Sequence, residues 1–231
     1  MFYTIVVFVS SLPAIAVLIW FKCARYPYPV PLYALSLFAG LVSFFTGVVI
    51  QSNFKSLGEF IISSGSMRTE KWAMLYKYFI QVAFSEELSR LILLIIVFII
   101  IKQTQWFQNS INNTILVRAS GLIAGFGFTV LESTVLGISS TAVPMLRLFS
   151  AAPLHGACGF RVASSITKFK EKPIKSVSNF LSAVIIHGSY NLLISRNHFP
   201  SQFIAFLVVI FTLSSSVVII FNEMKGSEEF T

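Results

Sequence analysis

The stretch Gln81–Ile101, "QVAFSEELSRLILLIIVFIII", decides the fold class, because it places three ionisable residues inside a long apolar run. A helix needs about 20 apolar residues to cross the hydrocarbon core of a bilayer. Glu86, Glu87 and Arg90 interrupt this run at helical spacing, so all three can meet along one helix face and partly neutralise each other. The stretch predicts a membrane helix that carries either a structural ion pair or part of a functional site.

The whole chain is as apolar as this stretch. Its 231 residues are 55% hydrophobic and only 11% charged, and the mean hydropathy is +0.81, which is far outside the range of soluble domains. We therefore expect an all-α, polytopic transmembrane helical bundle of about seven spans, folded as a single integral membrane domain over residues 1–231. The apolar runs are residues 3–21, 32–50, 72–101, 115–138, 143–164, 177–194 and 203–221.

The distribution of lysine and arginine predicts the orientation. With the N-terminus outside, the inner segments hold most of the basic residues, including "KFKEKPIK" at 168–175, whereas the outer loops hold Lys55, Arg68, Lys71 and Arg196. Basic residues concentrate on the cytoplasmic side of membrane proteins. We expect an N-out, C-in protein of the plasma (inner) membrane. The formal charge of +8 then serves topology and binding to the lipid bilayer, and we predict no nucleic-acid partner.

Further ionisable groups lie inside other predicted spans. In "GLIAGFGFTVLES", Gly121, Gly125, Phe128 and Glu132 form one helical stripe, whose glycines permit close helix packing. Glu132 is therefore expected to face protein. In "RLFSAAPLHGACG", Arg147 precedes His155 by eight residues on a similar face.

In "IIHGSYN", His187 and Asn191 share a face at i and i+4. Ionisable residues in spans usually turn toward the bundle interior, so the sequence predicts a polar chamber between the central helices. Counted from the outer ends of the predicted spans, Glu86 and His155 share a level, while His187 and Glu132 lie roughly 10 Å higher. Helix tilt can absorb most of that difference.

Several membrane chemistries are excluded by missing residues. The chain contains no aspartate, which excludes a paired-aspartate protease. It contains neither an HExxH motif nor a GxSxG elbow, so the usual settings of a helical zinc protease and of a serine nucleophile are lacking. Glutamate combined with histidine remains.

At these residues the sequence resembles the PrsW-type family of the CAAX protease / Abi (CPBP) intramembrane protease superfamily. The resemblance covers about residues 84–193, within a core motif region of about 72–194. It rests on "EELSR", "GFGFTVLES", "HGACG" and "HGSYN", which are similar to the family elements EExxR, GxxFxxxEN, HxxxG and HxxxN. Ser133 stands where the PrsW pattern usually has asparagine.

The resemblance implies an intramembrane glutamic-type endopeptidase that hydrolyses a peptide bond in or near the membrane. It implies that Glu86 activates a water, that His155 helps to hold it, and that His187 and Asn191 stabilise the oxyanion. Glu87, Arg90 and Glu132 would orient the site, although helix geometry alone also allows Arg90 to pair with Glu86. The substrate would be a membrane-embedded or membrane-anchored peptide.

Three alternatives stay open. The expected mechanism needs no metal or other cofactor, but glutamate and two histidines can also ligate zinc, which would make a zinc-dependent membrane hydrolase. The same ionisable residues can form the path of an ion or proton-coupled transporter. A non-catalytic membrane scaffold is the third. The sequence leaves the oligomeric state unknown.

Overall fold

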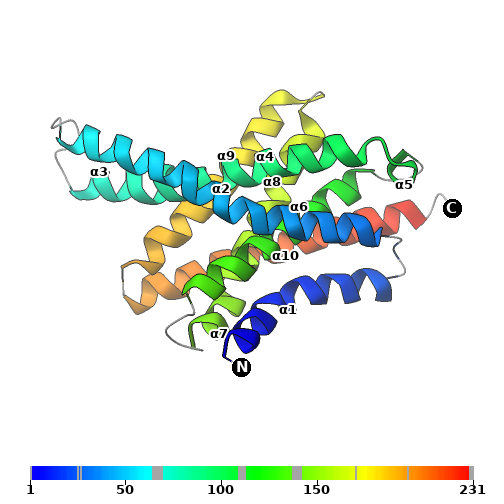
Figure 1. Cartoon of the computed structure of the whole chain (residues 1–231), viewed down its shortest axis with the longest axis horizontal. Coiled ribbons are helices and arrows are strands. Elements are labelled where there is room, and N and C mark those ends of the chain that lie inside the picture. Colours follow the sequence, from blue (N-terminus) through cyan, green and yellow to red (C-terminus); the bar gives the residue numbers. More distant parts are fainter. Residues whose placement is uncertain are drawn as a thin grey trace.

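The computed structural model describes residues 2–24, 26, 28–63, 70–108, 113–136, 142–169, 171–196 and 198–228. These residues fold into helices (Figure 1). In chain order the elements are α1 (Phe2–Cys23), α2 (Val30–Ser63), α3 (Glu70–Leu75), the π-helix η1 (Tyr76–Phe84), α4 (Ser85–Ile101), α5 (Gln105–Gln108), α6 (Asn113–Leu136), α7 (Ala142–Phe149), α8 (Ala151–Lys168), α9 (Pro173–Ile194) and α10 (Phe199–Glu228). The expected all-α class is confirmed.

Five of these helices are long and apolar enough to cross a membrane. They cover Thr4–Cys23, Val30–Ile62, Asn113–Leu136, Pro173–Ile194 and Phe199–Lys225. The chain is a multi-pass membrane protein, but the expected number of about seven spans is not confirmed.

The two other expected spans are helical but interrupted. Residues 72–101 are divided among α3, η1 and α4, because the backbone hydrogen bonds widen to the i→i+5 pattern of a π-helix over Tyr76–Phe84. The 143–164 run, whose first residues have no described side chains, is divided between α7 and α8, because Ser150 has non-helical backbone angles. Both interruptions lie within a few residues of the ionisable groups.

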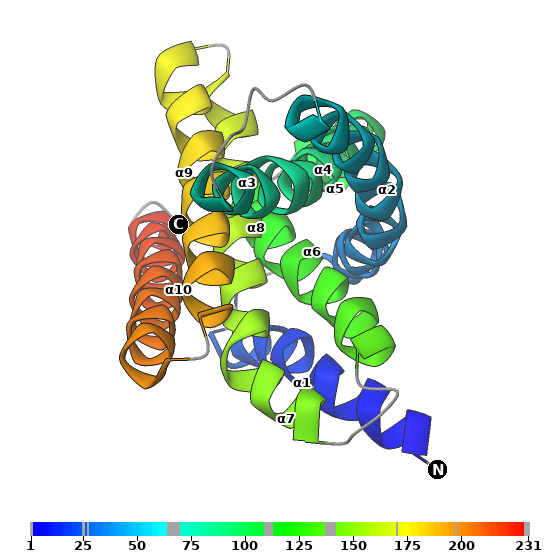
Figure 2. The same ribbon diagram turned by 90° about the vertical axis from the view of Figure 1, so that its left-hand side faces the viewer.

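Helix α6 is the centre of the bundle. Over an 18-residue apolar stretch of α6, 83% of the residues are buried, against 28–33% in the corresponding stretches of the other four helices. Figure 2 shows α6 and α8 between α10 on one side and α2 on the other. The outer helices turn large apolar side chains outward, for example Ile99 and Phe211, as expected for surfaces in contact with lipid tails.

Glycines allow α6 to pack closely against its neighbouring helices. A Cβ atom at Gly121 would collide with the backbone of Gly159 on α8, and one at Gly125 would collide with the backbone of His155. On the opposite side, Gly40 of α2 lies against the backbone of Ala124. The predicted glycine stripe therefore packs closely against its neighbours, as expected, and it places α6 directly against the backbone of His155.

Candidate functional site

The glutamate pair begins helix α4, immediately after the π-helix. Glu87 and Arg90 are fully buried, and Glu86 is 9% exposed. Arg90 forms an ion pair with the Glu87 carboxylate, and its guanidinium also lies 4.9 Å from the centre of the Phe128 ring. Helix geometry allowed either glutamate as the partner, and the structure places Glu87 in that position. The second carboxylate, Glu86, is left for another role.

His187 on α9 contacts both glutamates. Its Nδ1 lies 2.8 Å from Glu87 Oε1, and its Nε2 lies 3.6 Å from Glu86 Oε2. Gly188 permits this approach, because a side chain there would collide with the ring of Phe79 on η1. The Glu87 carboxylate accepts a hydrogen bond from Nδ1–H of His187, so that Nε2 faces Glu86.

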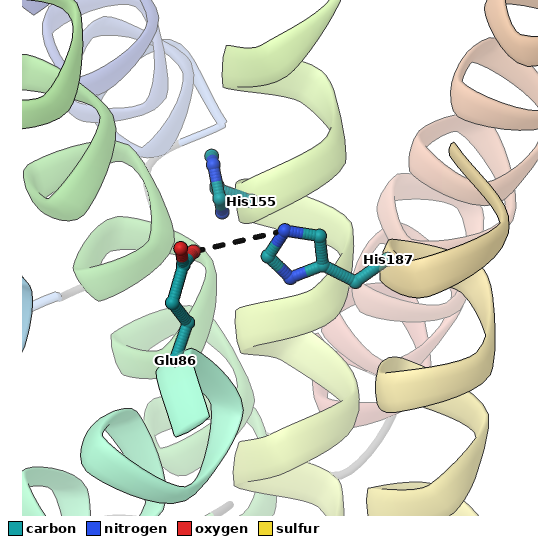
Figure 3. A group of neighbouring side chains, drawn as sticks. All are labelled: Glu86, His155 and His187. Carbon is teal, nitrogen blue, oxygen red and sulfur yellow. Dashed lines mark ion pairs between the residues drawn. The ribbon is translucent and has the colours of Figure 1, made fainter. Parts of the chain in front are cut away.

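His155 on α8 completes the central group, whose side chains point toward one another in Figure 3. The rings of His155 and His187 lie 4.9 Å apart and almost perpendicular to each other. One ligand atom from each of Glu86, His155 and His187 can be chosen so that all three lie within 4.8 Å of one another. Glu86 Oε2 is buried and accepts no hydrogen bond from the described residues.

Glu132 on α6 holds His155 from the other side. Its Oε2 lies 2.8 Å from His155 Nε2, and the same carboxylate forms an ion pair with Arg147 of α7. Arg147 Nε also donates a hydrogen bond to Ser133 Oγ over 3.0 Å. On the far side of the imidazole, His155 Nδ1 lies 3.3 Å from an Arg90 nitrogen. His155 is thus positioned by charged groups from three helices.

The structure brings Glu86, Glu87, His155, His187, Arg90 and Glu132 together, whereas Asn191 has a different status. It lies one turn after His187 on α9 and is half-buried. Its carboxamide makes no hydrogen bond to the part of the chain that the structure describes. Asn191 is therefore close to the group along its helix without contacting it.

Arg147 is a member of the cluster to which the sequence analysis assigned no role in the site. It was expected on a common helical face with His155, but Ser150 separates α7 from α8. The two residues meet through Glu132 instead. The sequence did contain a signal for this pair. A carboxylate within an apolar span needs a cation, and Arg147 is the next basic residue along the chain after Glu132.

A cleft opens beside the cluster between α2, η1, α4 and α6. Its volume is about 250 Å³. Glu86 and Glu132 line it together with apolar residues of α2 and α6. The small exposed part of Glu86 therefore has access to the outside of the bundle through this opening.

Fold and site together define a multi-pass helical membrane protein with a buried carboxylate and histidine cluster that is reached through a cleft. Residues 28–218 match the family model described as "PrsW family intramembrane metalloprotease", so the chain belongs to the PrsW family. It is accordingly an enzyme, an intramembrane peptidase that acts on membrane-embedded substrates. No curated protein and no solved structure matches the chain.

Proposed function

We propose that Glu86 activates a water molecule that hydrolyses a peptide bond in or near the membrane. The observation that carries this proposal is the buried Glu86 oxygen without a hydrogen-bond partner among the described residues, located within 4.8 Å of two histidines. The other two carboxylates are each paired with an arginine, Glu87 with Arg90 and Glu132 with Arg147. Glu86 is therefore the carboxylate that remains available as a general base.

In the proposed reaction Glu86 takes a proton from water, and the water oxygen attacks the carbonyl carbon of the substrate. The carbon–nitrogen bond then breaks as Glu86 returns the proton to the leaving nitrogen, giving a new carboxyl group and a new amine. His155, held by Glu132, would keep the water in place.

The developing oxyanion needs hydrogen-bond donors. The Glu87 carboxylate at Nδ1 stabilises a protonated His187, whose Nε2–H group can then donate toward the substrate oxygen. Asn191, one turn further along α9, would supply a second donor from its carboxamide, which makes no hydrogen bond to the described residues. In other enzymes one such donor contributes about 10² to 10³ in rate.

The family description names a metalloprotease, and the residues here fit a metal in type and spacing. Glu86, His155 and His187 would be the ligands, since one oxygen and two nitrogens converge within 4.8 Å and this donor set suits catalytic zinc. When bound, zinc lowers the pKa of its water and polarises the substrate carbonyl. Glu87 already orients His187 in the way that carboxylates orient zinc-binding histidines.

Family membership supports a peptidase over the transporter and scaffold alternatives. We further propose that the 231 residues form one integral domain in the plasma membrane with the N-terminus outside, as the distribution of basic residues indicates. The four motifs support a place for the chain in the wider CAAX protease superfamily.

The test is cleavage by purified protein in detergent of a panel of fluorogenic single-span peptides, with fragments identified by mass spectrometry. We expect defined fragments from the wild type and none from Glu86→Gln. Glu59→Gln is the matched control, because Glu59 carries the same carboxylate on an exposed face of α2. Fragments that persist in Glu86→Gln would refute the assignment of the base.

A further inference from the structure

The cleft beside Glu86 lies between two central helices, α2 and α6. Gly40 and Phe44 of α2 contact Ala124 and Phe128 of α6, and the lining of the cleft continues beyond this contact to Gln51 on α2 and Leu136 on α6. The opening has a volume of about 250 Å³. Its inner end is formed by the Glu86 carboxylate, so an occupant of the cleft would reach the proposed base.

The mouth of the cleft is apolar. Val48 on α2, and Val135 and Leu136 on α6, line it and are each about half exposed, at 48–49%. Charged side chains are confined to the inner end, where Glu86 and Glu132 lie. The opening therefore faces the apolar surface of the bundle, and an apolar segment can enter it without leaving a hydrocarbon-like environment.

Gln51 is the uncharged polar residue of this lining. It follows Phe44 and Val48 on the same face of α2, at spacings of seven and three residues. Its side chain is half-buried and makes no hydrogen bond to the described residues. A carboxamide offers both a donor and an acceptor, which is the pattern that an extended peptide backbone requires.

A peptide bond inside a membrane helix is inaccessible to a nucleophile until the helix unwinds locally. Unwinding exposes backbone N–H and C=O groups, which are costly to leave unpaired in an apolar environment. A carboxamide beside the unwound segment compensates part of this cost. Gln51 lines the same cleft as Glu86, which fits that requirement.

We propose that this cleft binds an unwound, apolar segment of a membrane-spanning peptide, with Gln51 hydrogen-bonding its backbone and Val48 contacting its side chains. The inference rests on the proposed peptidase function and adds the form in which the substrate is bound. Phe44 and Phe128 close the inner wall, so the side chains nearest the cleaved bond must be small or medium in size.

The first experiment compares two neighbouring positions on α2. Val48→Trp should fill the cleft and lower kcat/KM for single-span peptides by about tenfold or more. Val49→Trp is the matched control, because Val49 is 63% exposed and does not line the cleft, and it should stay within about twofold of wild type. Equal losses in the two variants would overturn the proposed binding site.

The second experiment tests the backbone hydrogen bond. Gln51→Leu should lower kcat/KM by about 3- to 10-fold, mainly through a higher KM. In a series of peptides with a single backbone ester in place of an amide, this penalty should vanish for the ester that removes the bonded N–H or weakens the bonded carbonyl. A Gln51→Leu penalty that is the same for every ester peptide, or that is absent, would refute the role of Gln51.

A binding measurement separates this inference from the proposed function. In a Glu86→Gln background, a small diazirine-bearing aliphatic amino acid at position 48 should crosslink a single-span apolar peptide, and the same group at position 49 should not. Crosslinking at 48 without any cleavage by the wild type would reject the proposed chemistry and retain the cleft. Equal crosslinking at both positions would reject the cleft whatever the wild type cleaves.

Discussion

Glu87 Oε1 lies 2.8 Å from Nδ1 of His187, so the carboxylate that pairs with Arg90 also fixes the orientation of a histidine from another helix. Glu86, the adjacent residue, faces the other nitrogen of the same imidazole at 3.6 Å. Consecutive residues on a helix point about 100° apart. Here that angle separates a carboxylate with structural partners from one whose Oε2 has no hydrogen-bond partner among the described residues.

The two glutamates should therefore respond differently to the same substitution. Glu86→Gln should remove turnover while the melting temperature stays near that of the wild type, because Glu86 Oε2 has no hydrogen-bond partner to lose among the described residues. Glu87→Gln should leave Arg90 buried without its counter-ion, at a cost of about 3 to 5 kcal/mol. Peptide cleavage and thermal unfolding in one detergent measure both effects. A destabilised Glu86→Gln beside a stable, inactive Glu87→Gln would reverse the assignment.

Metal dependence can be tested directly. If Glu86 acts as the base without a metal, cleavage should survive dialysis against EDTA or phenanthroline, and elemental analysis should find no stoichiometric zinc. Loss of activity on chelation, with recovery when zinc is added, would establish a zinc-dependent mechanism instead. In that case His187→Ala should also lower zinc occupancy, whereas Cys23→Ala, which alters an exposed cysteine, should not.

Arg147 should act as a positioning residue, because it contacts Glu132 and Glu132 contacts His155. Arg147→Leu removes the arginine partner of a mostly buried carboxylate, Glu132, which keeps only its contact with His155, and should cost about 1 to 3 kcal/mol, with a fall in kcat greater than the change in KM. Arg147→Lys, which restores the charge, should recover part of kcat. Lys55→Ala is the control for removing a cation from an exposed pair and should change neither quantity. A loss of stability with kcat preserved would limit Arg147 to a structural role.

The close contact between α6 and α8 should make stability and activity sensitive to methyl groups added to α6. Gly121→Ala and Gly125→Ala should each destabilise the protein by about 1 to 3 kcal/mol, since both introduce a methyl group against backbone atoms. Only Gly125 faces the backbone of His155, so Gly125→Ala should lose more activity than Gly121→Ala at matched stability. Equal activity losses would show that the shift of the α8 backbone caused by the new methyl group does not reach the His155 imidazole.

The predicted orientation can be read from the native cysteines. Cys23, at the end of α1, is exposed, and Cys158 on α8 is buried. With the N-terminus outside, a membrane-impermeant maleimide should label Cys23 only after the cells are permeabilised. The variant Cys23→Ala should then remain unlabelled. Labelling of Cys23 in intact cells would place the N-terminus inside.

The helical stripe of α6 was predictable because it depends on local periodicity. Gly125, Phe128 and Glu132 were expected on one face, and in the structure all three contact His155. The choice of Glu87 as the partner of Arg90 did not follow from spacing, because i+3 and i+4 are both allowed on a helix. The partner is set by the contacts of Arg90 with Phe128 and of Glu87 with His187, which join distant parts of the chain.

Depth along the spans was predicted less well than helical faces. Counting residues from the outer ends set His187 and Glu132 roughly 10 Å above Glu86, whereas His187 contacts Glu86 and Glu132 contacts His155. Residue counts convert to depth only when helices are parallel and unbroken. Here α6 runs obliquely to α8 (Figure 2), and Ser150 separates Arg147 from the helix of His155.

The π-helix that precedes Glu86 makes the cluster sensitive to chain length. Because η1 uses the i→i+5 hydrogen-bond pattern over Tyr76–Phe84, it holds more residues per turn than an α-helix of the same height. If one residue were deleted while this hydrogen-bond pattern was kept, α4 would turn by somewhat less than the roughly 100° that each residue contributes in an α-helix. The glutamates would then rotate away from the histidines, although every residue of the cluster would still be present in the sequence.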